Sequence, residues 1–577
     1  MASIRRAGRV LSAGALLTAG LIPWAGPVPA ARGAEGLSYT WEQASFPSGD
    51  GTALHADILR SPGTPAGRKS PVILTVSPYV NHAGVAGADY DPRRNGPSPR
   101  YFDFLVQARV LERGYTYVMV DLRGTGGSGG CTDWGGPGEQ ADVKAAVEWA
   151  GTQPWSSGRV GMFGMSYDGW TGLMAIANRP KHLAAVVAME PVYDGYRYLY
   201  TNGVRFQQSV ITPPLFVLND AAPGTPADRP DYLLGGASPN APCYALNIGG
   251  QQDDRPDAGF WQARALVGKA TGARTPLFMT QGFLEQNTRP DGAFTFFKGM
   301  LGKKRAWFGQ FDHVSGYEIQ YGEIASGRNG FIAEAMRFFD RYVKGLPSAK
   351  APTEKDPPVA VQAIDGRYRA EASWPPADAF RLSTVLQRGR YPDDNRNFGD
   401  AAEQRAGDKL WSISQPLRTA AHLSGEPVLQ ATVEAILPRA NLVANVYDID
   451  ALGRAQMISR GTALVRTEGR SDHTIAMYGQ DWTIPAGHRI GVTLSGSNRE
   501  WWMHVPTSTE VWVERARISL PFLRFARTSF LDGWAGQRLL EFRLERFQVP
   551  AATIDAAMTR FNLPGPLQRR PAARGGR

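Results

Sequence analysis

One short stretch has the residue types and spacing for nucleophilic chemistry. "GRVGMFGMSYDGWTG" (158–172) changes from a buried-strand pattern to a helical pattern at Ser166. A serine at the carboxyl end of a buried parallel strand lies where open α/β sheets bind ligands, and its tight turn needs glycines. Gly164 and Gly169 meet that need, although Asp168 stands at the second glycine position of the G-x-S-x-G pattern. Ser166 is therefore a candidate nucleophile, and a helix N-cap is the alternative interpretation.

A nucleophilic serine needs a base, and in this type of fold the acid and then the histidine follow it on loops after later strands. Between Ser166 and the β-rich part of the chain the histidines are His182 and His313. His182 is expected at the amino end of a strand, on the wrong edge of the sheet, in a structural role. His313 follows the strand pattern "RAWFGQ" and is expected on the same edge as Ser166, with an ordinary loop histidine as the alternative.

The acid should follow the strand "TPLFMTQG", where the sequence is "FLEQNTRPDG". Glu285 and Asp291 both qualify. Glu285 is nearer the strand end, whereas Pro290 is expected to begin a helix and to carry Asp291 away from the edge. Asp312 adjoins His313, which makes an orienting hydrogen bond to the ring awkward. We predict that Glu285 orients His313.

Alternating strands and helices must position these residues. Strand patterns occupy 71–79, 115–124, 158–166, 183–190, 275–282 and 305–310, and helical patterns occupy 101–114, 139–153 and 170–180. A hairpin is expected before them at 45–61. Such alternation predicts right-handed βαβ units in an α/β fold with a doubly wound, mostly parallel sheet.

The domain organisation is predicted from the length of the chain and from changes in residue pattern along it. The chain has 577 residues, of which 43% are hydrophobic, more than one core usually holds. We predict a catalytic domain from 31–190 and 275–350, and a helical cap inserted at 191–274. A C-terminal β-sandwich follows at 351–550, where short alternating segments are separated by turn residues, and a basic tail closes the chain at 551–577.

The first thirty residues have the layout of a secretory signal peptide. Three arginines precede the 13-residue apolar run "VLSAGALLTAGLI" and the small-residue exit "VPA". We expect cleavage after Ala30 and export of a protein without a stable membrane span, an uncleaved anchor being the alternative. Of the net charge of +10, these arginines and the four of the tail supply +7, so no nucleic-acid partner is expected.

Cys131 and Cys243 are the two cysteines of the chain. The first lies in a glycine-rich loop and the second in the predicted cap. In an exported protein, an even number of cysteines favours pairing. We predict a disulfide between the cap and the catalytic domain, with two buried thiols as the alternative.

Taken together, these residues resemble the cocaine-esterase and X-Pro dipeptidyl-peptidase superfamily of α/β-hydrolases, which also includes α-amino-acid ester hydrolases. The resemblance rests on "SPY" (77–79), "DLRGTGGSGG" (121–130), the long run at 139–169, "QGFLEQN" (281–287) and "FGQFDH" (308–313). It covers nearly the whole mature chain, and the Ser-Tyr-x-Gly elbow is the variant of that family.

The resemblance implies an α/β-hydrolase core, a mostly helical cap and a jelly-roll-like β-domain. It also implies roles: Ser166 as the acylated nucleophile, His313 as general base and then acid, and Glu285 as the acid, where the family usually has Asp. The oxyanion would be held by the hydroxyl of Tyr79 and the backbone amide of Tyr167, with half-buried packing as the alternative for Tyr79. The reaction would be hydrolysis of an ester or amide through an acyl-enzyme.

This chemistry needs no metal and no cofactor, and no His/Cys/Asp group at ligand spacing stands out. "GTGGSGG" (124–130) fits a dinucleotide-binding pattern, but the next helix begins only near residue 139, which argues against a phosphate cradle. A non-catalytic ligand-binding protein on a hydrolase scaffold is the other alternative.

The expected substrate is a small ester or a short peptide. An X-Pro peptidase must bind a free ammonium, and the candidate carboxylates are Glu190, Asp194, Asp89 and Asp91. The aromatic stretch "YDGYRYLY" (193–200) suggests either an apolar substrate pocket or packing beneath the cap. No feature of the sequence specifies an oligomeric state.

Overall fold

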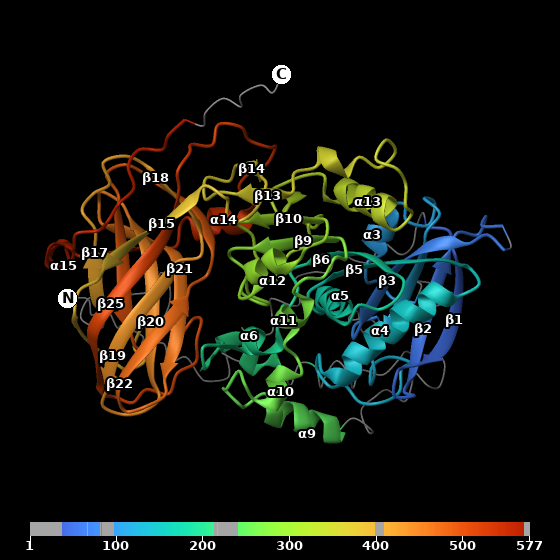
Figure 1. The fold of residues 1–577 in the computed structure, drawn as a ribbon, viewed down its shortest axis with the longest axis horizontal. Helices are drawn as coiled ribbons and strands as arrows, with labels where there is room; N and C mark the ends of the chain where they lie inside the picture. The colour runs from blue at the N-terminus through green and yellow to red at the C-terminus, as the bar shows by residue number, and fades with distance from the viewer. Residues whose placement is uncertain are drawn as a thin grey trace, which may run out of the picture.

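The computed structural model describes residues 37–65, 67–80, 82, 97–212, 216, 241–397 and 409–569. The predicted signal sequence at 1–30, together with Asp89 and Asp91, lies outside these residues. Figure 1 shows a domain of mixed helices and strands, the expected hydrolase domain, beside a domain built almost wholly of strands. Within the described ranges, no helix combines the length and the apolar character needed to cross a membrane.

The centre of the hydrolase domain is one ten-stranded sheet with the order β1-β2-β4-β3-β5-β6-β9-β10-β13-β14. From β4 to β13 the neighbouring strands run parallel, while β1, β2 and β14 are antiparallel additions at the two edges. The strands are β1 Thr40–Pro47, β2 Ala53–Arg60, β3 Ser70–Ser77, β4 Thr116–Asp121, β5 Ser156–Met165, β6 Leu183–Met189, β9 Leu277–Gly282, β10 Lys304–Gly309, β13 Val359–Gln362 and β14 Tyr368–Glu371.

Helices cover both faces of this sheet (Figure 1). Val72, Leu74 and Val76 of β3 pack into the same core as α4 and α5, while Ile73 between them packs into the core formed by α3 and α13. Successive side chains of a strand point to opposite faces, so a strand buried on both sides reads as a continuous apolar run. The helices are α3 Phe102–Gln107, α4 Pro137–Thr152, α5 Tyr167–Asn178, α12 Ala293–Gly299 and α13 Phe331–Tyr342.

The α/β fold predicted from the sequence is confirmed, with one helix shorter than expected. The helical pattern at 101–114 gives α3, which ends at Gln107. Arg109 has φ of 51° and Gly114 has φ of 81°, both in the left-handed region that a continuing α-helix does not allow. The chain therefore leaves the helical path at Arg109 and turns again at Gly114 before β4 begins.

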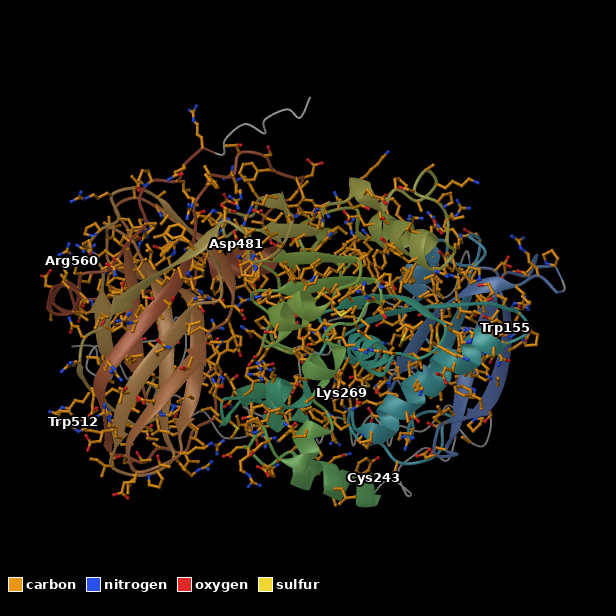
Figure 2. All side chains as sticks on the ribbon, viewed as in Figure 1. Trp155, Cys243, Lys269, Asp481, Trp512 and Arg560 are labelled. Carbon is orange, nitrogen blue, oxygen red and sulfur yellow. A yellow bond between two sulfur atoms is a disulfide. The ribbon has the colours of Figure 1, made fainter. Side chains whose placement is uncertain are left out.

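The segment between β6 and β9, where we predict a cap, consists of short helices and two short strands where the structure describes it. Its elements are α6 Gly195–Leu199, β7 Tyr200–Thr201, β8 Val204–Arg205, the 3₁₀ turn η2 Gln207–Val210, α9 Ala241–Gly250, α10 Gly259–Gln262 and α11 Leu266–Ala270. Cys243 of α9 is joined to Cys131 in a disulfide, with Cα atoms 5.9 Å apart. Figure 2 labels Cys243 at the outer end of the cap, so the disulfide ties that end to the loop after β4.

The C-terminal domain is a sandwich of two antiparallel sheets around a separate apolar core. Along β25, alternate residues such as Ile518, Leu520 and Phe522 are buried in that core. One sheet contains β15 Ala379–Val385, β16 Gly389–Pro392, β18 Ala421–Gly425, β19 Val428–Ala435, β22 Gly469–Ala476, β23 Gln480–Ile484 and β25 Glu510–Leu523. The other contains β17 Leu410–Ile413, β20 Ala440–Ile449, β21 Arg454–Val465, β24 Arg489–Ser495 and β26 Arg546–Gln548.

Two predicted boundaries differ from the structure. The hydrolase domain does not end at 350, because β13 pairs with β10 and β14 pairs with β13. The basic tail does not begin at 551, because α15 Ala551–Ala556 follows the short helix α14 Gln537–Phe542 and β26, and Phe561 is buried in the sandwich core. The backbone N–H of Gln568 also donates to the carbonyl of Arg524 at 3.0 Å. Phe561 therefore anchors this part of the predicted tail to the sandwich.

Candidate active site

Ser166 lies on a sharp turn between β5 and α5. It has φ of 62° and ψ of −124°, a strained conformation for a residue with a side chain. Its backbone N–H donates to the carbonyl of Met189 at 2.9 Å, and its side chain makes no capping hydrogen bond to α5. A Cβ on Gly164 would lie 2.5 Å from the Asp168 Cβ, so the turn needs glycine there. Ser166 is partly exposed, and its hydroxyl is not used as an N-cap.

Asp168, at the second glycine position of the elbow, has a structural partner. Its carboxylate accepts hydrogen bonds from Arg100 Nε and from the Tyr101 hydroxyl, the latter at 2.7 Å. The same Tyr101 oxygen accepts from the backbone N–H of Met165 at 2.8 Å. The Arg100 guanidinium in turn lies 4.7 Å from the ring centroid of Tyr79. Asp168 thus links the start of α5 to the segment before α3.

Glu285 and His313 are in direct contact. The His313 Nδ1 lies 2.7 Å from Glu285 Oε2, and Glu285 Oε1 accepts backbone hydrogen bonds from Asn287 at 2.5 Å and Thr288 at 3.2 Å. The carboxylate is fully buried, whereas the imidazole is 19% exposed. Asp312 ties the two loops together, because its Oδ1 accepts from the backbone N–H groups of Gln286 and His313, both at 2.9 Å. A buried acid therefore holds a ring whose edge reaches solvent.

Asp291 and His182 lie elsewhere. The Asp291 carboxylate accepts from Arg197 at 2.7 Å and from the Thr201 hydroxyl at 3.3 Å, beneath the cap. His182 stands at the amino end of β6, where its Nδ1 lies 2.8 Å from the carbonyl oxygen of Gly158. Neither side chain is placed to serve His313.

Glu190, until now a candidate ligand for an ammonium, is a buried carboxyl group beside Glu285. It follows β6 directly, and it shares a hydrogen bond with Glu285. Its oxygens also accept from the Thr280 hydroxyl at 3.0 Å, the Gln281 side-chain amide at 3.1 Å and the Gly282 backbone at 2.9 Å. Its place at a strand end on the same edge as Ser166 is the signal that marks it in the sequence.

The charges of this group are unequally distributed. Burial and the neighbouring Glu285 charge raise the pKa of Glu190 well above its usual value, which favours its protonated form. Burial also opposes ionisation of Glu285, but the charge and hydrogen bond of His313, with hydrogen bonds from Asn287 and Glu190, lower the Glu285 pKa. For His313, burial lowers the pKa, but Glu285 and the Asp312 and Glu318 charges together raise it, so the net shift is upward. The environment therefore favours ionisation of the carboxylate on the imidazole over ionisation of the one behind it.

Tyr79 and Tyr167 meet beside the elbow. Tyr79 follows β3, is 8% exposed, and its ring centroid lies 6.2 Å from that of Tyr167 at an angle of 85°. The Tyr167 hydroxyl donates to Glu139 Oε2 at 2.5 Å, inside the hydrolase core. Burial and the Asp133 charge raise the pKa of Glu139 to about 8. Tyr167 is the first residue of α5, where backbone N–H groups have no intrahelical partner.

The aromatic stretch at 193–200 serves mainly in packing. Tyr193 donates to the Gln281 side chain at 2.7 Å, and Tyr196 stacks on Tyr200 with centroids 5.4 Å apart. Tyr198 differs, because its hydroxyl donates to Asn287 Oδ1 at 3.3 Å, two residues after Glu285. A small cavity of about 20 Å³ opens at this point, lined by Tyr198, Phe206, Gln208, Ser209, Ile211, Thr212 and Asn287. The cap therefore forms one wall of a hollow beside the Glu285 loop.

Sheet topology relates Ser166 to this pair. The strands β5, β6, β9 and β10 are consecutive parallel neighbours, so Ser166, Glu190, Glu285 and His313 all follow strand ends at the same edge. Such an edge carries the ligand sites of open α/β sheets. The arrangement can hold a serine, an accessible imidazole and a buried acid in one place.

Two family patterns match the chain. X-Pro dipeptidyl-peptidase (S15 family) matches residues 50–315, and the X-Pro dipeptidyl-peptidase C-terminal non-catalytic domain matches residues 352–520. Proteins named "Putative Xaa-Pro dipeptidyl-peptidase" are 25% identical in Streptomyces avermitilis and 23% in Rhodopirellula baltica. These matches cover 66% and 83% of this chain, and 59% and 87% of the relatives. Cocaine esterase from a Rhodococcus is 28% identical over 58% of this chain and 59% of its own length.

Solved structures agree with the fold. A CocE/NonD family hydrolase from Staphylococcus aureus superposes with a TM-score of 0.64 at 16% identity, covering 84% of this chain and 94% of that one. An α-amino acid ester hydrolase gives 0.62 at 18% identity over 84% and 97%. These likenesses extend across both the hydrolase domain and the β-sandwich.

Proposed function

This chain belongs to the superfamily of α/β-hydrolases that includes the X-Pro dipeptidyl-peptidases and cocaine esterase, and it is a serine hydrolase; we propose that Ser166, His313 and Glu285 form its catalytic triad. The observation that carries the proposal is the 2.7 Å contact between His313 and the buried Glu285, at the sheet edge where Ser166 ends β5. A strained serine without a capping role and an accessible imidazole are what a nucleophile and its base require.

The mechanism follows from the protonation states. Neutral His313 takes the proton of the Ser166 hydroxyl as the oxygen attacks the carbonyl carbon of an ester or amide. Ionised Glu285 accepts from Nδ1 and stabilises the imidazolium that forms. His313 then gives the proton to the departing alcohol or amine, which leaves an acyl-enzyme. A water molecule, deprotonated by His313, releases the acid and restores Ser166.

Two donors are proposed for the oxyanion of the tetrahedral intermediate. The backbone N–H of Tyr167 is one of the amides without an intrahelical partner at the start of α5. The hydroxyl of Tyr79 is the other, because its ring lies against Tyr167 and beside Arg100 at the end of β3. The Arg100 cation over the ring also favours a polarised phenol hydroxyl.

An ester is the substrate class that the described site favours over an X-Pro peptide. An X-Pro peptidase must hold a free ammonium with a carboxylate in the pocket. Glu190 is fully buried and its oxygens accept from three neighbours, while Asp194 caps α6 through the Tyr196 backbone N–H at 3.1 Å. Both carboxyl groups are therefore committed within the fold, which leaves neither of them free to hold an ammonium.

The test combines labelling and turnover. Wild-type protein should react with a fluorophosphonate probe, and Ser166→Ala should not. A panel of chromogenic esters and an X-Pro anilide should then give turnover on the esters with the anilide far slower. Labelling that survives in Ser166→Ala would refute the triad, whereas faster anilide cleavage would refute only the ester preference.

Export is a separate part of the proposal. It is supported by the predicted signal peptide and by the disulfide between Cys131 and Cys243, since such bonds persist in oxidising compartments. Expression in a host with its export machinery, followed by amino-terminal sequencing, should give a mature chain that begins near residue 31. A product that keeps its first residues inside the cell would contradict export.

A further inference from the structure

A second group of chemistry-bearing side chains lies at the other flank of the hydrolase sheet. His55 and Asp57 are two residues apart on β2, and His82 comes from the segment after β3. The His82 Nε2 lies 3.1 and 3.2 Å from the two Asp57 oxygens, and the His55 Nε2 lies 4.0 Å from Asp57 Oδ1. All three side chains are at most 5% exposed. The three donor atoms lie within 4.8 Å of one another.

These separations suit a shared cation. Donors bound to one ion at about 2.0–2.2 Å lie about 3 to 4 Å apart, which matches the two contacts of Asp57. Imidazole nitrogen and carboxylate oxygen are ligands of Zn²⁺ and of related divalent ions. The spacing of these residues in the sequence does not reveal the group, because an entire strand separates His82 from His55 and Asp57.

The outer contacts have the arrangement found around metal ligands. The His55 Nδ1 lies 3.1 Å from Asp121 Oδ2, which directs the Nε2 lone pair away from Asp121 and toward Asp57. Gln43 Oε1 also lies 3.1 Å from this Nε2, so an amide oxygen is available as a fourth donor. The Trp41 indole N–H donates to Asp57 Oδ1 at 2.8 Å and orients that carboxylate.

Charge balance points the same way. Asp57 and Asp121 are both 1% exposed, and each lies against a histidine of this group. Buried carboxylates favour positive charge nearby. A divalent cation bound between these side chains would supply such charge, and protons on the histidines would be the competing solution.

We propose that His55, Asp57 and His82 form a closed binding site for a divalent first-row transition cation, with zinc as the first probe. The site joins β2 to the segment after β3, and Asp121 adds the end of β4. His82 is three residues beyond Tyr79, so the cation also fixes the segment that carries the proposed oxyanion donor. Its role is structural, because burial leaves no open position for a substrate.

Metal analysis of protein purified without a histidine tag gives the first test. Wild type, either as isolated or after incubation with ZnCl₂ and gel filtration, should hold about one zinc ion per chain. Asp57→Asn and His82→Gln should hold less than about one tenth of that, and Asp121→Asn should bind roughly 10- to 100-fold more weakly. The matched control is His504→Gln, which changes another buried histidine, paired with Asp393 at 2.5 Å, and should keep its zinc.

A second measurement covers variants that fail to fold. Wild type reconstituted with Co²⁺ should show the d–d absorption of a low-coordinate nitrogen and oxygen site, and X-ray absorption should find two imidazole ligands. A chelator should lower the melting temperature of wild type and ZnCl₂ should restore it. Zinc content near zero after incubation with ZnCl₂, or equal content in wild type and Asp57→Asn, would overturn the proposal and leave a proton-balanced network.

Discussion

The hydrolase domain and the β-sandwich each contain a histidine whose ring nitrogen lies 2.7 Å from a buried carboxylate. In the first, the pair is His313 and Glu285; in the second, it is His422 and Asp481. The sandwich pair even has a serine, because the Ser424 hydroxyl donates to Asp481 Oδ2 at 2.7 Å. The chemical groups and the distance between histidine and acid are the same in both, so they do not show which of the two is reactive.

The surroundings separate them. Asp481 also receives two hydrogen bonds from Arg369 at 2.7 and 2.6 Å, and Ser424 is fully buried and bonded to the acid. Glu285 instead has backbone amides and the Glu190 carboxyl group around it. Ser166 is partly exposed on a strained turn. An acid that serves one imidazole, with a serine left uncommitted, distinguishes a reactive group from a structural one.

The comparison is tested most strongly by removing each imidazole. His313→Gln should lower kcat by about 10⁴- to 10⁶-fold, because no other group can accept the Ser166 proton. His422→Gln should keep kcat near wild type and lower the free energy of unfolding by about 1–3 kcal/mol, since Asp481 loses one of its hydrogen bonds. Steady-state turnover and urea unfolding measure the two effects. Comparable losses of kcat in both variants would erase the distinction.

The acid partner gives the next largest effect. Glu285→Gln should lower kcat by about 10²- to 10⁴-fold, because the neutral amide no longer stabilises the imidazolium. Asp291→Asn is the matched control, since that carboxylate binds Arg197. Turnover of one activated ester compares them. If the Asp291 change proves the more damaging, Glu285 is not the acid of the triad.

A smaller loss of rate is expected when a proposed donor to the oxyanion is removed. Tyr79→Phe should lower the acylation rate by about 10²- to 10³-fold, with little change in ground-state binding. Tyr196→Phe removes another buried phenol hydroxyl, one that donates to the Asp254 carbonyl in the cap, and should leave acylation unchanged. Pre-steady-state kinetics on a chromogenic ester gives both rates. An acylation rate near wild type in Tyr79→Phe would return that ring to packing.

The smallest effect is a displacement along the pH axis. The pKa of His313 is raised above 6.5, so kcat/KM should fall as the pH drops through a value above 6.5 and protonates the base. Glu285→Gln removes the charge that raises this pKa and should move the acid limb to lower pH. Because burial and the Glu285 charge favour the protonated form of Glu190, Glu190→Gln should leave the limb in place. A downward shift in Glu190→Gln would show that Glu190 is ionised.

Sequence patterns predicted the parallel sheet because β3, β5 and β10 are apolar on both faces, and they ranked Glu285 ahead of Asp291 by distance from the strand end. They did not reveal Glu190 as a partner of Glu285, since that contact joins the ends of two strands about ninety residues apart in the chain. Nor did they separate His82 from an ordinary loop histidine. Residues that act within one element leave a periodic signal, whereas contacts across strand ends depend on the finished sheet.

The pairing of β13 and β14 with the hydrolase sheet has a consequence for how the molecule comes apart. Arg369 on β14 is bonded to Asp481 in the sandwich, and the Gln310 side chain donates to Gln480 Oε1 at 2.6 Å. Melting of either domain would strip the other of an edge strand or leave a buried charge without its partner. Heat should therefore produce a single calorimetric transition. If the β-sandwich were exchanged between relatives, the edge of the catalytic sheet that contacts it would have to be exchanged as well. The two domains are therefore expected to be inherited together.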